Sequence, residues 1–140
     1  MKYLAIFFPL LIFTNATCFG EPSGLINFEM TYHDKNVPSK YVFNSKEGNT
    51  FSRNCYTSKM DVKNCIARQR LKKPIKNEIL KLTKINASIP AKTCEYHLKG
   101  STIYLKSQDN TLEGFCYFIE DSSAVSLPTI RNKYKNSLVR

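Results

Sequence analysis

The feature that most constrains the fold of this chain is the placement of its cysteines. Of the five cysteines, Cys18 lies near the amino terminus, and Cys55, Cys65, Cys94 and Cys116 are spread through the remainder. Four is an even number, so a chain that loses its first residues can form two disulfides in an oxidising compartment. Three pairings are allowed. We expect the sequential one, Cys55 with Cys65 and Cys94 with Cys116, because each pair brackets a local supersecondary unit.

The amino-terminal residues follow the three-part plan of a cleavable signal peptide. Lys2 supplies a short positive region, residues 3–13 form an eleven-residue apolar run, and residues 14–20 are small and mostly polar. A membrane-spanning helix needs about twenty apolar residues, so this run is too short for a permanent anchor. We therefore expect residues 1–20 to be a signal peptide cleaved before Glu21. The mature protein would be secreted or periplasmic, without a transmembrane anchor.

Cys18 allows an alternative, a bacterial lipoprotein acylated on that thiol. Acylation needs an aliphatic residue three positions before the cysteine and a small residue directly before it. Asn15 and Thr17 occupy those two positions. Soluble export is therefore the favoured interpretation.

The composition is that of a globular protein with a strong positive charge. Hydrophobic residues make up 42% of the chain, and 21 lysines and arginines oppose 11 aspartates and glutamates, which gives a net charge of +10. Such a domain is attracted to nucleic acid, to phospholipid headgroups or to an acidic protein. The charge does not choose among these partners, and it would also serve simply to keep an exported protein in solution.

Alternating hydrophobicity predicts most of a sheet. Within residues 25–32, the side chains of Ile26, Phe28, Met30 and Tyr32 fall on one face, which is typical of a half-buried strand. The chain therefore favours an α+β fold with a small antiparallel sheet of about five to six short strands, stabilised by the disulfides. The other strand-like segments are residues 40–44, 50–56, 94–98, 102–106 and 115–119.

The middle of the chain predicts a central basic helix. Residues 63–84 contain eight basic residues and a single acid, Glu78. Pro74 suits the first position of a helix, and apolar residues then recur with helical spacing at Ile75, Ile79 and Leu82. We therefore expect a basic helix over residues 74–84, in preference to a strand over residues 79–85.

This basic segment is also the candidate surface for an anionic partner. It contains no aromatic side chain, so base stacking with nucleic acid is unsupported, and its apolar stripe lacks the Trp or Phe of a membrane-binding helix. A solvated helix face is the simpler interpretation, and contact with an acidic partner is the functional one. The candidate residues are Arg68, Arg70, Lys72, Lys73, Lys76, Lys81 and Lys84.

Motifs for catalysis, metal binding or cofactor binding do not occur in the sequence. There is no CxxC, and neither histidine has the spacing of a zinc ligand, so we expect neither a metal nor a cofactor. One enzymatic alternative remains, a small secreted ribonuclease-like hydrolase or toxin in which His33 and His97 act as base and acid. Two ordinary histidines are the simpler interpretation. Asn86 begins a glycosylation sequon, which matters only in a eukaryotic host.

The length predicts a single globular domain, residues 21–126, followed by a basic tail, residues 127–140. The tail carries four basic residues and no acid, and we expect it to be frayed or to form a short amphipathic helix. The favoured function is that of a non-enzymatic module that binds a protein or an anionic surface outside the cytoplasm. Its partner is not identified by the sequence.

Overall fold

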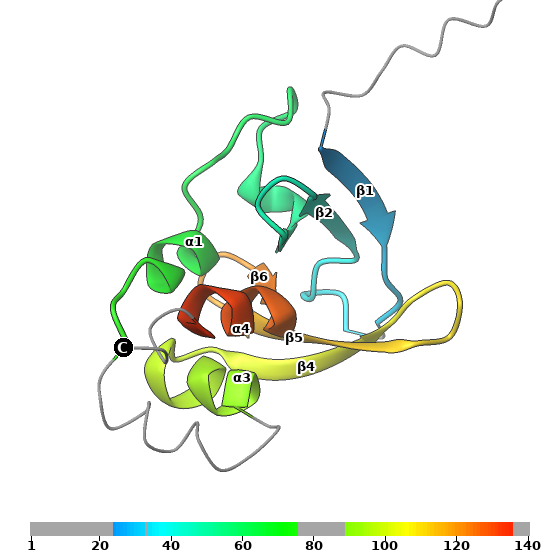
Figure 1. The fold of residues 1–140 in the computed structure, drawn as a ribbon. Coiled ribbons are helices and arrows are strands. Elements are labelled where there is room, and N and C mark those ends of the chain that lie inside the picture. The colour runs from blue at the N-terminus through cyan, green and yellow to red at the C-terminus, as the bar shows by residue number, and fades with distance from the viewer. Residues whose placement is uncertain (1–23, 33, 76–88, 136–140) are drawn as a thin grey trace, which may run out of the picture.

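The computed structural model describes residues 24–32, 34–75 and 89–135, which form an α+β fold (Figure 1). Its described part contains a six-stranded sheet and three short α-helices. Two further helical turns are a 3-10 turn, η1, and a π-helical turn, η2. The strands are β1 (Leu25–Glu29), β2 (Lys40–Asn44), β3 (Asn49–Ser52), β4 (Ser101–Lys106), β5 (Leu112–Phe118) and β6 (Ser123–Ser126). The helices are α1 (Ile66–Leu71), α3 (Ile89–Lys92) and α4 (Leu127–Lys135), and the turns are η1 (Arg53–Cys55) and η2 (Thr93–His97).

The sheet is entirely antiparallel and has the strand order β1-β2-β3-β6-β5-β4. Each half of the chain contributes one three-stranded meander, because β1, β2 and β3 pair in sequence and so do β4, β5 and β6. The two meanders meet where β3 pairs with β6, at Phe51 and Val125. The predicted small antiparallel sheet is thus confirmed.

The sheet curls until its two outer strands touch. The N–H of Thr31, just beyond β1, donates to the carbonyl of Lys106 in β4 over 2.9 Å, and the N–H of Lys106 donates back over 3.3 Å. A curled antiparallel sheet encloses one face and leaves the other face outside, so each strand divides its side chains between two cores.

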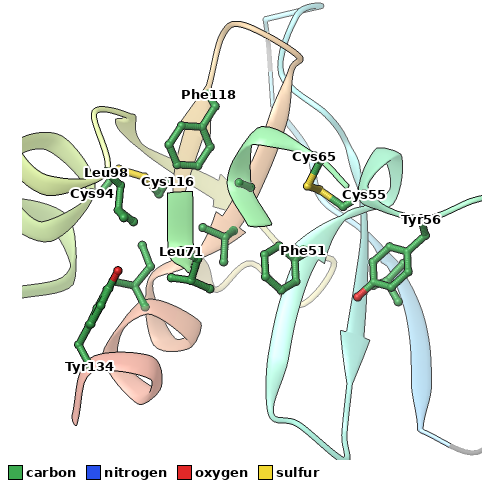
Figure 2. Close-up of a cluster of buried hydrophobic side chains, with 14 residues drawn as sticks. Phe51, Cys55, Tyr56, Cys65, Leu71, Cys94, Leu98, Cys116, Phe118 and Tyr134 are labelled. Carbon is green, nitrogen blue, oxygen red and sulfur yellow. A yellow bond between two sulfur atoms is a disulfide. The ribbon is translucent and has the colours of Figure 1, made fainter. Parts of the chain in front are cut away.

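The two cores lie on opposite faces of the sheet. The inner core gathers Met30, Val37, Tyr41, Leu105, Phe115, Tyr117 and Ala124. The outer core lies under the helices and contains both disulfides, together with Phe51, Leu71, Phe118 and Tyr134 (Figure 2). In β5, Phe115 and Tyr117 therefore face inward and Cys116 and Phe118 face outward, as the alternation of that segment predicts.

Both disulfides join the cysteines in the expected sequential order. Cys55 bonds to Cys65, and Cys94 bonds to Cys116. These bonds suggest an oxidising, extracytoplasmic setting. Across the described ranges, no helix is long and apolar enough to cross a membrane.

Two predicted strands are corrected by the structure. Residues 94–98 are not a strand: α3 continues into η2, and the Thr93 hydroxyl donates to the Ile89 carbonyl one turn earlier. The strand predicted over residues 50–56 ends at Ser52, where the chain turns into η1 and the Ser52 hydroxyl donates to Asn54 Oδ1. Each of the two segments contains a fully buried half-cystine, Cys94 or Cys55. Burial in the outer core therefore decides the backbone conformation there, rather than local strand propensity.

The predicted basic helix is not part of the described structure. Pro74 and Ile75 are described and are not helical, and residues 76–84 lie outside the described residues, as does the signal segment 1–20. A helix that the sequence analysis did not predict, α1, precedes them and carries Arg68 and Arg70. Residues 127–135, placed in the basic tail, form α4, which buries Ile130 and Tyr134 in the outer core.

Candidate anion-binding groove

Helix α1 is fixed in place by the turn between β5 and β6. The N–H of Ile66 donates to Asp121 Oδ2 over 2.7 Å, and the N–H of Ala67 donates to the hydroxyl of Ser123 over 3.0 Å. These bonds satisfy first-turn N–H groups that a helix cannot satisfy itself. The disulfide at Cys65, directly before the helix, ties the same end to Cys55. Basic side chains on α1 therefore project from a rigid support.

Arg70 of α1 is committed to internal contacts. One guanidinium nitrogen, Nη2, forms a salt bridge with Glu120, and the other, Nη1, donates to the carbonyls of Leu98 over 2.7 Å and Lys99 over 3.0 Å. The guanidinium also lies 5.5 Å from the ring centre of Phe118. Arg70 thus joins α1 to the segments after η2 and β5, and its charge is neutralised by Glu120.

Arg68 is held between two aromatic rings. Its guanidinium carbon lies 4.1 Å from the ring centre of Phe51 and 4.8 Å from that of Tyr56. Burial raises the pKa of Tyr56, and the neighbouring Arg68 opposes that rise. The Arg68 Nε atom and the Tyr56 hydroxyl are buried without a hydrogen-bond partner in the described part of the chain. In that part of the chain no acid forms a salt bridge with Arg68, in contrast to Arg70.

A groove of about 580 Å³ opens beside Arg68, between β3, α1 and α4. We call it the cationic groove. It contains three cationic side chains and one carboxylate, Glu47. Its lining residues are Glu47, Asn49, Phe51, Val62, Arg68, Leu71, Lys72, Asn132 and Lys133.

The third wall of the cationic groove is α4, which is attached to the rest of the fold by two hydrogen bonds. The N–H of Thr50 in β3 donates to the hydroxyl of Thr129 over 2.8 Å, and the Tyr134 hydroxyl donates to the carbonyl of Lys73 over 3.2 Å. Because both ends of α4 are attached in this way, Lys133 is placed on the same groove as Lys72, the residue that follows α1. Both lysine side chains are exposed.

The structure brings together only some of the candidate residues. Arg68 and Lys72 line the cationic groove, Lys73 is exposed beside it, and Arg70 is paired internally. Lys76, Lys81 and Lys84 lie outside the described residues. Sequence reasoning missed Lys133, although the excess of basic residues after position 126 was a signal for it.

Of the two candidate histidines, only His97 lies within the described residues. His97 lies in η2 and is half-buried, with its ring edge-on to Tyr134 at 5.9 Å between ring centres. Its Nε2 atom is buried and has no hydrogen-bond partner in the described ranges. His33 lies outside them. Within the residues that the structure describes, no group of three or more His, Cys, Asp or Glu side chains could hold a metal ion.

Comparison with protein families, with characterised proteins and with solved structures finds no match to this chain. The cationic groove is the feature that offers the most chemistry, since it combines an immobilised guanidinium, two exposed ammonium groups and two amide side chains, those of Asn49 and Asn132.

Proposed function

We propose that this protein is an exported, non-enzymatic binding module that takes an acidic protein surface in its cationic groove. The observation that carries the proposal is the convergence of Arg68, Lys72 and Lys133 on one groove with Glu47 as the opposing charge. The excess of positive charge in the groove has the same sign as the net charge of +10. An anionic partner would therefore be attracted at long range and held at short range.

Arg68 suits carboxylate recognition because it is already ordered. Contacts with the Phe51 and Tyr56 rings restrict the guanidinium, and this planar group can bind a carboxylate through two parallel hydrogen bonds. Less conformational entropy is lost when a partner meets a side chain that is already fixed. Lys72 and Lys133 are mobile point charges that would add attraction without requiring one geometry.

The lining of the groove favours a protein over a nucleic acid. Its one aromatic member, Phe51, is only 2% exposed and is covered by Arg68, so no ring is free to stack on a base. Val62 is 66% exposed at the groove and offers an apolar contact. Cationic and amide groups around a single aliphatic contact are typical of the polar rim of a protein interface.

Export is part of the proposal. The disulfides support an oxidising setting, and residues 1–20 have the composition of a signal peptide. The partner would accordingly be met in the periplasm or outside the cell.

The proposal is tested with a poly-glutamate peptide as the acidic probe and with the oxidised protein. The double variant Lys72→Glu and Lys133→Glu reverses two charges in the groove, and the matched control Lys35→Glu and Lys59→Glu makes the same change in net charge at exposed lysines elsewhere. We expect the groove variant to bind at least about tenfold more weakly than the control variant. Equal loss in both variants would show that only net charge matters and would refute the groove.

Two parallel titrations separate the other partner classes. Single-stranded RNA and vesicles containing anionic phospholipid are offered to the same variants across a series of salt concentrations. Poly-glutamate binding should weaken as salt rises, because exposed charges are screened. If RNA or vesicles bind more tightly than poly-glutamate, and the groove variant loses that binding, the partner is a nucleic acid or a membrane and not an acidic protein.

A further inference from the structure

The outer edge of β1 is incompletely paired. On one side, Leu25 to Glu29 pair with β2 from Asn44 to Lys40. On the other side, the contact with β4 is the single bridge between Thr31 and Lys106. Among the residues that the structure describes, none pairs with this outer edge between Leu25 and Glu29. We call the opening between that edge and the β4–β5 hairpin the seam.

Hydrogen bonds on either side of β1 show which backbone groups face the seam. The Met30 N–H donates to Ser39 on the side of β2, and the Thr31 N–H donates to Lys106 on the side of β4. Successive residues of a strand direct their backbone groups to opposite edges. The N–H and C=O groups of Asn27 and Glu29 therefore face the seam, where they can receive an added strand.

Two cavities open along the seam. The first has a volume of about 560 Å³ and the second about 580 Å³, and both include Asn27, Phe28 and Glu29 of β1 and Gln108 of the hairpin. Cavities on both sides of an edge strand give room for the alternating side chains of an extended peptide.

The first cavity combines apolar and acidic groups. Ile26 is 51% exposed, Phe28 and Phe43 are half-buried, and all three line it. The charged residues of its lining are Glu29, Asp109 and Glu113, and no lysine or arginine is among them. This is the opposite of the net charge of +10, so the cavity is locally complementary to a cation.

We propose that the seam binds an extended peptide of a partner protein as an additional β-strand, in which basic residues alternate with aliphatic ones. Its backbone pairs with Asn27 and Glu29. Its basic side chains enter the first cavity, where their aliphatic stems cover Ile26 and Phe28 and their ammonium groups meet the carboxylates of Asp109 and Glu113. Its aliphatic side chains face the second cavity, where Lys40 and Arg53 would repel a basic side chain. The seam is lined by residues other than those of the cationic groove, so it is a second and independent binding surface.

The probe is a capped hexapeptide of alternating lysine and valine, titrated into the ¹⁵N-labelled oxidised protein. We expect the largest shifts at the amides of Asn27 and Glu29. A peptide with the same side chains but N-methylated backbone amides cannot donate to the edge and should bind at least about tenfold more weakly. A glutamate-and-valine peptide should also bind at least about tenfold more weakly, because it meets like charges.

Matched variants locate the site. Glu113→Lys should lower the affinity for the lysine-and-valine peptide several-fold. Glu95→Lys makes the same charge change at an exposed site outside both cavities and should leave that affinity unchanged. The Lys72→Glu and Lys133→Glu variant should bind the peptide as the wild type does, which separates the seam from the cationic groove. Unchanged affinity on N-methylation, or no binding at about 1 mM peptide, would overturn the proposal. Dimerisation through β1 without peptide would also overturn it, since a second copy would then occupy the seam.

Discussion

Gly100 lies directly against the Cys94–Cys116 disulfide: a Cβ atom at position 100 would come within 2.6 Å of the Cys116 Sγ atom and within 3.0 Å of the Tyr117 carbonyl. Side-chain atoms do not approach so closely, so the start of β4 can pack on β5 only without a side chain there. We predict that Gly100→Ala lowers the free energy of unfolding by about 1–3 kcal/mol. Urea denaturation measures this, with Ser101→Ala at the neighbouring exposed position as the control. Equal stability of the two variants would contradict the close approach.

Tyr41 and Tyr117 share the inner core but differ in their hydroxyl groups. Tyr117 donates to the Asn36 carbonyl over 3.0 Å, whereas the Tyr41 hydroxyl is buried without a partner in the described ranges, and burial raises its pKa. Removing an unpaired buried hydroxyl relieves a desolvation cost, while removing a paired one loses a hydrogen bond. We predict that Tyr41→Phe leaves stability unchanged or raises it, and that Tyr117→Phe lowers it by about 1 kcal/mol. Urea denaturation checks this, and we expect the midpoint of Tyr41→Phe to lie above that of Tyr117→Phe. The reverse order would contradict the prediction.

Asp109 makes the β4–β5 hairpin sensitive to acid. Hydrogen bonds from the Ser107 and Thr111 side chains, and from the Thr111 backbone, lower the pKa of Asp109 from 3.8 to about 2. Because the folded pKa lies below the ordinary one, the stabilisation is complete above about pH 4 and is lost as the pH falls through about 2. We predict that Asp109→Asn is less stable than the wild type at neutral pH and that the two converge near pH 2. Thermal unfolding at a series of pH values tests this. A difference in stability between the two proteins that does not change with pH would contradict the prediction.

The ribonuclease alternative makes a separate prediction. If the protein is a binding module, replacing both His33 and His97 with alanine leaves capture of the acidic probe intact, and the wild type does not hydrolyse RNA. A fluorescent RNA substrate and the poly-glutamate assay measure the two properties on the same samples. Hydrolysis that disappears in the double variant would establish the enzyme instead.

The strands that sequence predicts well are those whose pattern is set locally. Segment 40–44 coincides with β2, and segment 102–106 with all but the first residue of β4. β6 was missed because it has four residues, Ser-Ala-Val-Ser, all buried between β3 and β5. Serine at a buried position has no hydrophobic signal. Its burial depends on partners such as the Thr129 hydroxyl, which lies 2.8 Å from that of Ser126.

The sequence predicted the candidate site only where its basic residues lie close together along the chain. The cluster of basic residues on and after α1 pointed to Arg68 and Lys72, which line the cationic groove. It could not reveal that Arg70 is paired with Glu120, fifty residues later in the chain. Nor could it place Lys133 beside Lys72, because that proximity depends on the packing of α4 against β3 and α1.

Each disulfide closes within one half of the chain. Cys55–Cys65 lies before residue 76 and Cys94–Cys116 lies after residue 88, while the halves meet through the β3–β6 pairing and the bonds from α1 to Asp121 and Ser123. One peptide cut between Ile75 and Ile89 would therefore leave two separately oxidised fragments with no covalent link. Such fragments would be the two parts of a split protein: they would run as two bands on a non-reducing gel, and their reassembly would restore the β3–β6 pair and the contacts of α1.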